Sequence, residues 1–234
     1  MKKKKKLYEG KTKKLYAIEE QEQLIQEFKD DISSSDGNIT GTIKGKGATN
    51  KQISATLFEY LEGFNIQTHF VKDLGPREML IRRLEMIPVE LLMRNIAIGS
   101  FSERFGLVQG EELKCPIMEF YLKDPAHQHP MINQSHMIAF KMATADEVKM
   151  IERMASKINA ILKSYFMRRN IKLIDFKLEF GRYNNKILLG DEITPDTCTL
   201  WDVHTQTRIE TDVTRTDSGT AEKAYDQLKN RLIS

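Results

Sequence analysis

Hydrophobic and polar residues alternate along residues 174–181, Ile-Asp-Phe-Lys-Leu-Glu-Phe-Gly. A period of two places successive side chains on opposite faces of a β-strand, so Asp175, Lys177 and Glu179 share one face. The aromatic and aliphatic residues of the same stretch share the other face. A second apolar run, residues 188–193, follows a polar cluster of turn-forming residues. The pattern therefore predicts a β-hairpin whose first strand carries a row of charges.

The length of the turn decides which acidic residues face each other, because a shift of one residue moves a side chain to the opposite face. A two-residue turn at Asn184 and Asn185 would place Glu179 and Asp191 on opposite faces. A three-residue loop ending at Lys186 would instead set these carboxylates across from each other, about 5 Å apart. Their repulsion would be relieved by a divalent metal ion whose other ligands are phosphate oxygens. A solvated hairpin with paired surface charges is the alternative.

Three other stretches have the period of an amphipathic helix. The first follows a capping-box pattern at residues 49–52 and ends near Gly63. The second begins with another capping box at Thr144 and continues to about Arg169, and we expect it to be core scaffold without a chemical role. The third covers residues 221–232. Shorter apolar runs predict further strands at residues 24–28, 67–71, 79–84, 89–97 and 119–122.

Pro88 interrupts the strand pattern between two apolar runs. Because proline cannot donate to a β-ladder, we expect the chain to change course there, which suggests a hinge between two lobes. Arg94 lies near the end of the following apolar strand. An arginine is costly to bury without an anionic partner, so either an internal carboxylate or a bound anion is implied.

Residues 7–18 are expected to form a strand, a glycine turn and a second strand. Lys11 and Lys13 flank the turn after Gly10, where backbone amides could approach a phosphate and the ammonium groups could neutralise it. A solvated lysine-rich turn is the alternative. The sequence contains neither a Walker A motif nor a Rossmann glycine motif.

Composition limits the remaining possibilities. The chain has 234 residues, of which 40% are hydrophobic and 29% charged, as in an ordinary soluble globular protein. No apolar run reaches membrane-spanning length, and the N-terminal lysines do not precede a signal-peptide core, so we expect no membrane association and a cytoplasmic location. The net charge of +3 is smaller than the charge of the five lysines at positions 2–6. Nucleic-acid binding is therefore not expected.

Several of these segments, in this order, resemble the phosphoribosylaminoimidazole-succinocarboxamide synthase (SAICAR synthetase) family nearly from end to end. The resemblance implies an α+β fold related to ATP-grasp enzymes, with antiparallel sheets, packed helices and ATP between two lobes. The lobes would be residues 1–87, with the glycine and lysine turn, and residues 88–234, with the ribotide and metal residues. The resemblance rests on the motifs Gly10-Lys11-Thr12-Lys13, Pro88-Val89-Glu90 with Arg94 and Gly99-Ser100, residues 175–181, Gly190-Asp191-Glu192 and Pro195-Asp196.

The resemblance also implies a reaction and its residues. ATP would activate the carboxylate of carboxyaminoimidazole ribotide as an acyl phosphate, and L-aspartate would displace phosphate to give SAICAR in purine biosynthesis. The enzyme is expected to use Mg²⁺ and to be a homodimer. The catalytic residues would be Lys177, Asp175 and Lys13, and the metal ligands Glu179 and Asp191. The ATP-binding residues would be Lys11, Lys13, Glu85, Met86, Glu179 and Asp191. The substrate-binding residues would be Glu90, Arg94, Ser100, Lys177, Asp196 and Arg215.

Three positions depart from the family pattern. Thr199 replaces an arginine, His129 stands where an aspartate is common, and Ile98 stands where a small residue is usual. The first matters most, because a guanidinium binds carboxylate or phosphate in a way that threonine cannot. Either another basic residue such as Arg215 compensates, or the affinity is lower. A small-molecule kinase with similar lobes and an RNA-associated protein with a basic tail are the alternative functions.

Overall fold

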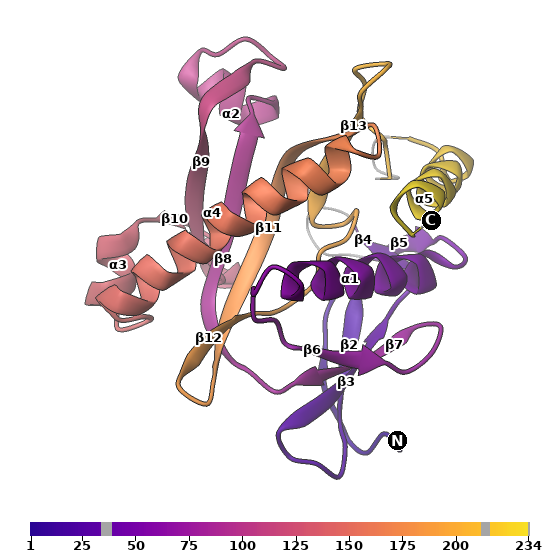
Figure 1. Ribbon diagram of the computed structural model, residues 1–234, viewed down its shortest axis with the longest axis vertical. Coiled ribbons are helices and arrows are strands. Elements are labelled where there is room, and N and C mark those ends of the chain that lie inside the picture. Colours follow the sequence, from indigo (N-terminus) through magenta and orange to yellow (C-terminus); the bar gives the residue numbers. More distant parts are fainter. Residues whose placement is uncertain (34–38, 212–215, 234) are drawn as a thin grey trace. The chain divides into compact units, whose positions relative to one another are not determined.

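The computed structural model describes residues 1–33, 39–211 and 216–233 (Figure 1). The chain divides into two compact units, and the first division falls after Glu85, near the predicted hinge. Two later segments also belong to the first unit, although the sequence places them in the second lobe. The first unit comprises Met1–Glu85, Glu192–Asp196 and Ile209–Ser234, and the second comprises Met86–Asp191 and Thr197–Arg208.

The first unit contains a five-stranded antiparallel sheet, a separate pair of strands and two helices. The sheet order is β1-β2-β3-β7-β6, and β4 pairs with β5. Helix α1 contacts strands β3, β6 and β7, and it also packs against α5, which explains why the end of the chain belongs to this unit. The elements are β1 (Lys6–Glu9), β2 (Lys13–Ala17), β3 (Gln23–Phe28), β4 (Asp31–Ser33), β5 (Ile39–Thr42), α1 (Lys46–Glu62), β6 (Phe70–Asp73), β7 (Glu78–Arg82) and α5 (Ser218–Ile233).

Helix α1 begins three residues before the predicted capping box, so that prediction is wrong. Thr49 lies inside the helix and is buried. Gly45 precedes the helix with a φ of 83°, a conformation that favours glycine. The Asp30 carboxylate caps the helix from outside, because it accepts hydrogen bonds from the backbone amides of Gly45 (3.2 Å) and Gly47 (2.8 Å). A cap supplied from elsewhere in the chain leaves no local sequence signal.

The second unit is a six-stranded sheet with helices. Its order is β10-β9-β8-β11-β12, and β13 also pairs with β11. The pairs β10–β9, β9–β8, β11–β12 and β11–β13 are antiparallel. Helix α4 packs across β11 (Figure 1). The elements are β8 (Glu85–Ile96), α2 (Gly99–Phe105), β9 (Glu112–Leu122), a 3₁₀ turn (Pro125–His127), β10 (Met131–Ile132), α3 (Gln134–Ala139), α4 (Ala145–Met167), β11 (Ile171–Tyr183), β12 (Lys186–Leu189) and β13 (Cys198–Asp202). The mixed α+β fold with antiparallel sheets is as predicted.

The capping box predicted for the long helix is confirmed. The Thr144 hydroxyl accepts from the Glu147 amide, and the Glu147 carboxylate accepts from the Thr144 amide. The buried stripe of α4 includes Val148, Ile151 and Leu162 and packs on the sheet. Strand β8 continues through Pro88 without a break, so the proline does not end the strand.

The hairpin of β11 and β12 has the two-residue turn. Asn184 and Asn185 have φ values of 48° and 59°, and Tyr183 pairs directly with Lys186. Positive φ at both central residues is typical of the type I′ turn, which matches the twist of the strands. In this register Glu179 faces Gly190, whose amide donates to the Glu179 carbonyl over 2.8 Å. The three-residue alternative, which opposed Glu179 and Asp191, is therefore wrong.

Candidate active site

Charged side chains, several of them buried, gather with polar partners in two groups, one in each unit. The Arg94 cluster of the second unit comprises Arg94, Arg104, Glu119, Tyr121 and Asp175. The Asp196 cluster of the first unit comprises Lys46, Asn50, Asp196 and Tyr225. Buried charges are costly unless they are paired, so these clusters are candidates for a functional role.

Arg94 lies between two carboxylates. Its Nε donates to Glu119 Oε2 over 2.6 Å and its Nη1 to Asp175 Oδ2 over 3.2 Å. Burial lowers the pKa of Arg94, but the hydrogen bond and charge of Glu119 outweigh that effect, so its pKa is raised and it stays charged. Of the two partners implied by the sequence, the structure shows the internal carboxylate. Glu119 also accepts from Arg104 and from the Tyr121 hydroxyl.

Asp175 is buried on β11, and it pairs in register with Thr199 on β13. Burial raises the pKa of the Asp175 carboxyl, while the hydrogen bond from Thr199 and the charge of Arg94 act in the opposite direction. Arg208 and Lys177 also act on this carboxyl through their charge. Thr199, where the family pattern has arginine, therefore contacts Asp175 directly.

Two other predicted residues of β11 have partners in the same unit. Lys177 Nζ lies 3.0 Å from Glu90 Oε1, and its side chain is 46% exposed. Glu179 is buried and accepts from Lys123 Nζ over 2.5 Å. The predicted row of charges on one face of β11 is confirmed, with Asp175 and Glu179 buried and Lys177 accessible.

In the first unit, Glu192 connects the glycine turn to the segment after β12. Its Oε1 accepts from Lys13 Nζ over 2.8 Å and from the Thr12 hydroxyl over 2.6 Å. Its Oε2 accepts from the Thr194 hydroxyl over 2.9 Å. The Glu192 side chain is only 2% exposed, so this carboxylate fixes the position of the Lys13 ammonium.

Asp196 lies between the two helices of the first unit. Its Oδ2 accepts from Lys46 Nζ over 2.5 Å and from Asn50 Nδ2 over 2.8 Å, both on α1. Its Oδ1 accepts from the Tyr225 hydroxyl of α5 over 2.8 Å. Its backbone amide donates to Thr194 Oγ1 over 3.2 Å, which fixes the turn that carries it.

The other predicted residues lie outside these clusters. Lys11, Glu85, Met86 and Ser100 are exposed, and Asp191 has a left-handed φ of 61° just after β12. Arg215 lies outside the described residues. Sequence reasoning missed the site residues whose partners are distant in the chain. Two of them had a local signal, since Lys46 lies in a glycine-rich run before a helix and Glu192 ends the Gly190-Asp191-Glu192 motif. The missed residues are Lys46, Asn50, Arg104, Glu119, Tyr121, Lys123, Glu192 and Tyr225.

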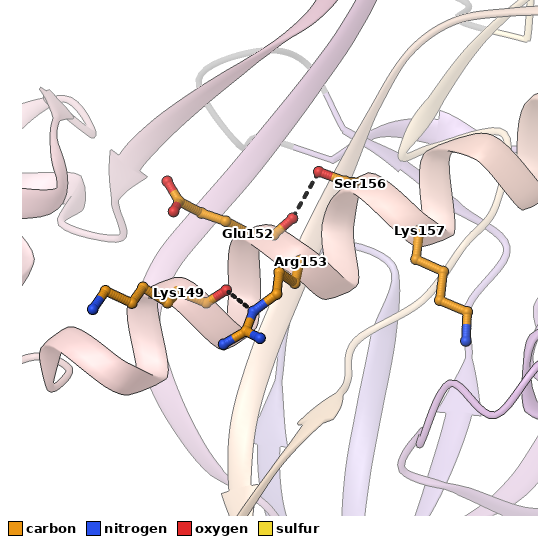
Figure 2. Close-up of a pocket in the computed structure, with 5 residues that line it drawn as sticks. All are labelled: Lys149, Glu152, Arg153, Ser156 and Lys157. Carbon is orange, nitrogen blue, oxygen red and sulfur yellow. Dashed lines mark hydrogen bonds between the residues drawn. The ribbon is translucent and has the colours of Figure 1, made fainter.

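The exposed face of α4 has a shallow hollow, which Figure 2 shows with its five lining residues. Arg153 Nε donates to the Lys149 carbonyl and the Ser156 hydroxyl to the Glu152 carbonyl, so these side chains bond to their own helix. Neither of these two hydrogen bonds involves a residue of the Arg94 or Asp196 cluster. That α4 is scaffold stays a prediction.

The described part of the chain has neither a ready-made metal cluster nor a membrane-spanning helix. No group of three or more His, Cys, Asp or Glu side chains is close enough to hold a metal ion by itself. Among the helices of residues 1–33, 39–211 and 216–233, none has the length and apolar character needed to cross a membrane.

Buried guanidinium, ammonium and carboxylate groups in a mixed α+β fold are a candidate site for anionic small molecules. The SAICAR synthetase family pattern matches residues 6–232. The chain therefore belongs to the SAICAR synthetase family, whose members are ATP-dependent ligases of purine biosynthesis.

Individual relatives agree with this assignment. A phosphoribosylaminoimidazole-succinocarboxamide synthase of Chloroherpeton thalassium is 48% identical over 100% of this chain and 99% of the relative. The crystal structure of the enzyme of that name from Ehrlichia chaffeensis is 39% identical, with a TM-score of 0.92 over 97% of this chain and 98% of its own. A SAICAR synthetase in complex with ADP is 42% identical, with a TM-score of 0.91 over 96% of both chains.

Proposed function

We propose that this enzyme joins L-aspartate to the carboxylate of carboxyaminoimidazole ribotide, with ATP converted to ADP and phosphate. The observation that carries the proposal is the 42% identity, over 96% of both chains, to a SAICAR synthetase in complex with ADP. The buried Arg94 cluster supports it, because a fixed guanidinium suits an anionic substrate.

The first proposed step activates the ribotide. A carboxylate oxygen of the ribotide attacks the γ-phosphorus of ATP, the bond to the bridging oxygen breaks, and ADP leaves with that electron pair. Phosphoryl transfer depends mainly on alignment and on neutralisation of charge. Lys11 and Lys13 would neutralise nucleotide phosphates, and Glu192 would keep the Lys13 ammonium in place.

The second proposed step forms the carbon–nitrogen bond. The aspartate amine attacks the acyl carbon, phosphate leaves with the electron pair of the broken carbon–oxygen bond, and the nitrogen loses a proton. Arg94 and Ser100 would hold the ribotide, and Asp175 and Asp196 would orient its polar groups. Lys177, 46% exposed and paired with Glu90, would provide a positive charge for the anionic groups of the substrates.

The carboxylates of this chain could hold Mg²⁺ only together with phosphate oxygens of the nucleotide. Mg²⁺ is usually held by one or two carboxylates, with phosphate oxygens and waters as its other ligands. Glu179 is a buried carboxylate of this kind, and Asp191 is the second predicted ligand, although the register does not set it opposite Glu179. When bound, the ion would reduce the negative charge of the phosphates. Lys123 would have to release Glu179 for this role.

The contacts of Glu85 and Met86 with the adenine and the homodimeric state are further parts of the proposal. Both side chains are exposed on β8, and Met86 is 40% exposed. Exchange of Met86 for a charged residue should raise the KM for ATP, and sedimentation equilibrium should give twice the mass of the chain.

The reaction is tested by the dependence of ADP release on its substrates. Purified enzyme should release ADP only when ATP, the ribotide and L-aspartate are all present, and mass spectrometry should detect the succinocarboxamide product. ADP release with the ribotide alone, at the full rate and with a phosphorylated product, would instead identify a small-molecule kinase.

A further inference from the structure

The carboxylate of Asp196 is held on both oxygens by groups from two different helices. Lys46 and Asn50 of α1 donate to Oδ2, and Tyr225 of α5 donates to Oδ1. The Asp196 side chain is 20% exposed, so part of it remains accessible to a substrate. Of its three donors, only Tyr225 comes from the C-terminal helix, which carries no residue of the predicted site.

We propose that Tyr225 is a positioning residue, whose hydroxyl fixes the orientation in which Asp196 meets the ribotide. The inference rests on the proposed function, in which Asp196 is a substrate-binding residue. A carboxylate that can turn about its terminal bond loses part of its binding energy when it is ordered, whereas one held on both oxygens is already in place.

The packing of α5 determines where the hydroxyl lies. Tyr225 is 2% exposed, and its neighbours on the same helix face, Ala221 and Leu228, are also buried. Burial, and then the charge of Asp196, raises the pKa of Tyr225 well above its ordinary value. The phenol therefore keeps its proton across the pH range of an assay and remains a donor.

The cluster also contains an unsatisfied acceptor. Asn50 is 1% exposed, and its Oδ1 has no hydrogen-bond partner among the residues that the structure describes. Buried polar atoms are nearly always paired, so a donor group of a bound substrate would complete the cluster after a small movement. This acceptor belongs to the same cluster as the Tyr225 bond, because the Asn50 side chain is also hydrogen-bonded to Tyr225.

The first test removes only the hydroxyl. Tyr225→Phe should raise the KM for the ribotide roughly tenfold, because the hydrogen bond joins a buried phenol to a charged group. The KM for ATP should stay within about twofold of wild type. Tyr165→Phe is the matched control, since Tyr165 is another buried helical tyrosine, in the second unit. The control should leave both constants unchanged.

A double-mutant cycle separates positioning from a general structural role. In an Asp196→Asn background, Tyr225→Phe should change the ribotide KM by less than about twofold, because its effect passes through the carboxylate. A further increase as large as in the wild-type background would overturn the inference. Asn50→Ala, which removes another donor to the same carboxylate, gives a second cycle if Tyr225→Phe does not fold.

The cycle also distinguishes failure of the inference from failure of the proposed function. If Asp196→Asn leaves the ribotide KM unchanged, the substrate role of Asp196 is wrong and the inference is overturned with it. If Asp196→Asn impairs the ribotide KM and Tyr225→Phe does not, the proposed function stands and only the inference is overturned.

Discussion

Strand β11 takes part in two arginine–carboxylate pairs with opposite properties. Near its start, Asp175 receives a single 3.2 Å contact from Arg94, which also binds Glu119. Near its end, Arg182 makes two contacts with Glu147 on α4, of 2.6 and 3.0 Å. Burial raises the pKa of Asp175, whereas the hydrogen bond from Arg182 is the main cause that lowers the pKa of Glu147 to about 2.

The difference separates a pair that stabilises the fold from a pair that does not. A lowered carboxyl pKa means that folding favours the ionised form, so the Glu147–Arg182 pair contributes stability at neutral pH. A raised carboxyl pKa means that folding disfavours the ionised form, so an ionised Asp175 destabilises the folded state. A charge that is kept at such a cost is typical of a functional site.

The largest effect is expected from Arg94→Lys. Lysine keeps the charge but cannot contact Glu119 and Asp175 through separate nitrogens, so the kcat/KM for the ribotide should fall about 10²-fold. The KM for ATP should change much less, as steady-state kinetics with each substrate varied will show. The matched control is Arg182→Lys in the other pair, which should leave the kinetics unchanged. Unaltered ribotide kinetics in Arg94→Lys would assign Arg94 a purely structural role.

Asp175→Asn should lower the activity without lowering the thermal stability. The change removes a carboxylate whose ionised form is disfavoured by burial, and Arg94 keeps Glu119 as its partner, so the midpoint of thermal unfolding should stay the same or rise. Turnover should fall by about tenfold or more, because the orienting charge is lost. Differential scanning calorimetry and steady-state assays measure both quantities. A large loss of stability would show that Asp175 supports the fold as Glu147 does.

A smaller effect is expected at the position where the family pattern has arginine. Thr199 lies opposite Asp175 in the β11–β13 register, and Arg208, which forms an isolated bridge with Trp201, also acts on Asp175 through its charge. If Arg208 supplies the missing guanidinium, Arg208→Ala should raise the ribotide KM, and Thr199→Arg should restore it. Arg153→Ala on the exposed face of α4 controls for the loss of one charge. If Thr199→Arg does not restore the ribotide KM of Arg208→Ala, Arg208 does not replace the arginine that the family pattern has at position 199.

The sequence predicted the parts of the fold that depend on local patterns. The β11–β12 hairpin, the capping box of α4 and the end of α1 at Gly63 all follow from neighbouring residues. The start of α1 could not be predicted, because its cap, Asp30, lies well before the helix. The register of the hairpin was ambiguous, since Asn184 and Asn185 fit a two-residue turn but Lys186 also fits a longer loop.

The site could be predicted only in part, for the same reason. Arg94 and Asp175 were identified from their types and positions, but Glu119, the stronger partner of Arg94, lies on a different strand. Asn50 and Tyr225 meet Asp196 only after α1 and α5 pack together. Contacts of this kind form only in the tertiary structure, so the local pattern of hydrophobic and polar residues does not reveal them.

The smallest effect is expected from Glu147→Gln, which removes the charge of the stabilising pair. Glutamine still fits a capping box, so the change isolates the ion pair with Arg182. Both side chains are partly exposed, at 21% and 27%, and solvent weakens the pair, so the free energy of unfolding should fall by about 1 kcal/mol or less at neutral pH. Glu152→Gln on the same helix should cost less, because Glu152 has no ion pair among the described residues.

The pH dependence of this effect has a definite sign. The pKa of Glu147 is lowered from 4.5 to about 2, so the stability it provides is complete above pH 4.5 and is lost as the pH falls toward 2. Urea unfolding of wild type and Glu147→Gln across this window should therefore give curves that differ at neutral pH and converge in acid. A difference that stays constant as the pH falls would mean that the variant acts through packing or the helix cap, and not through the ion pair.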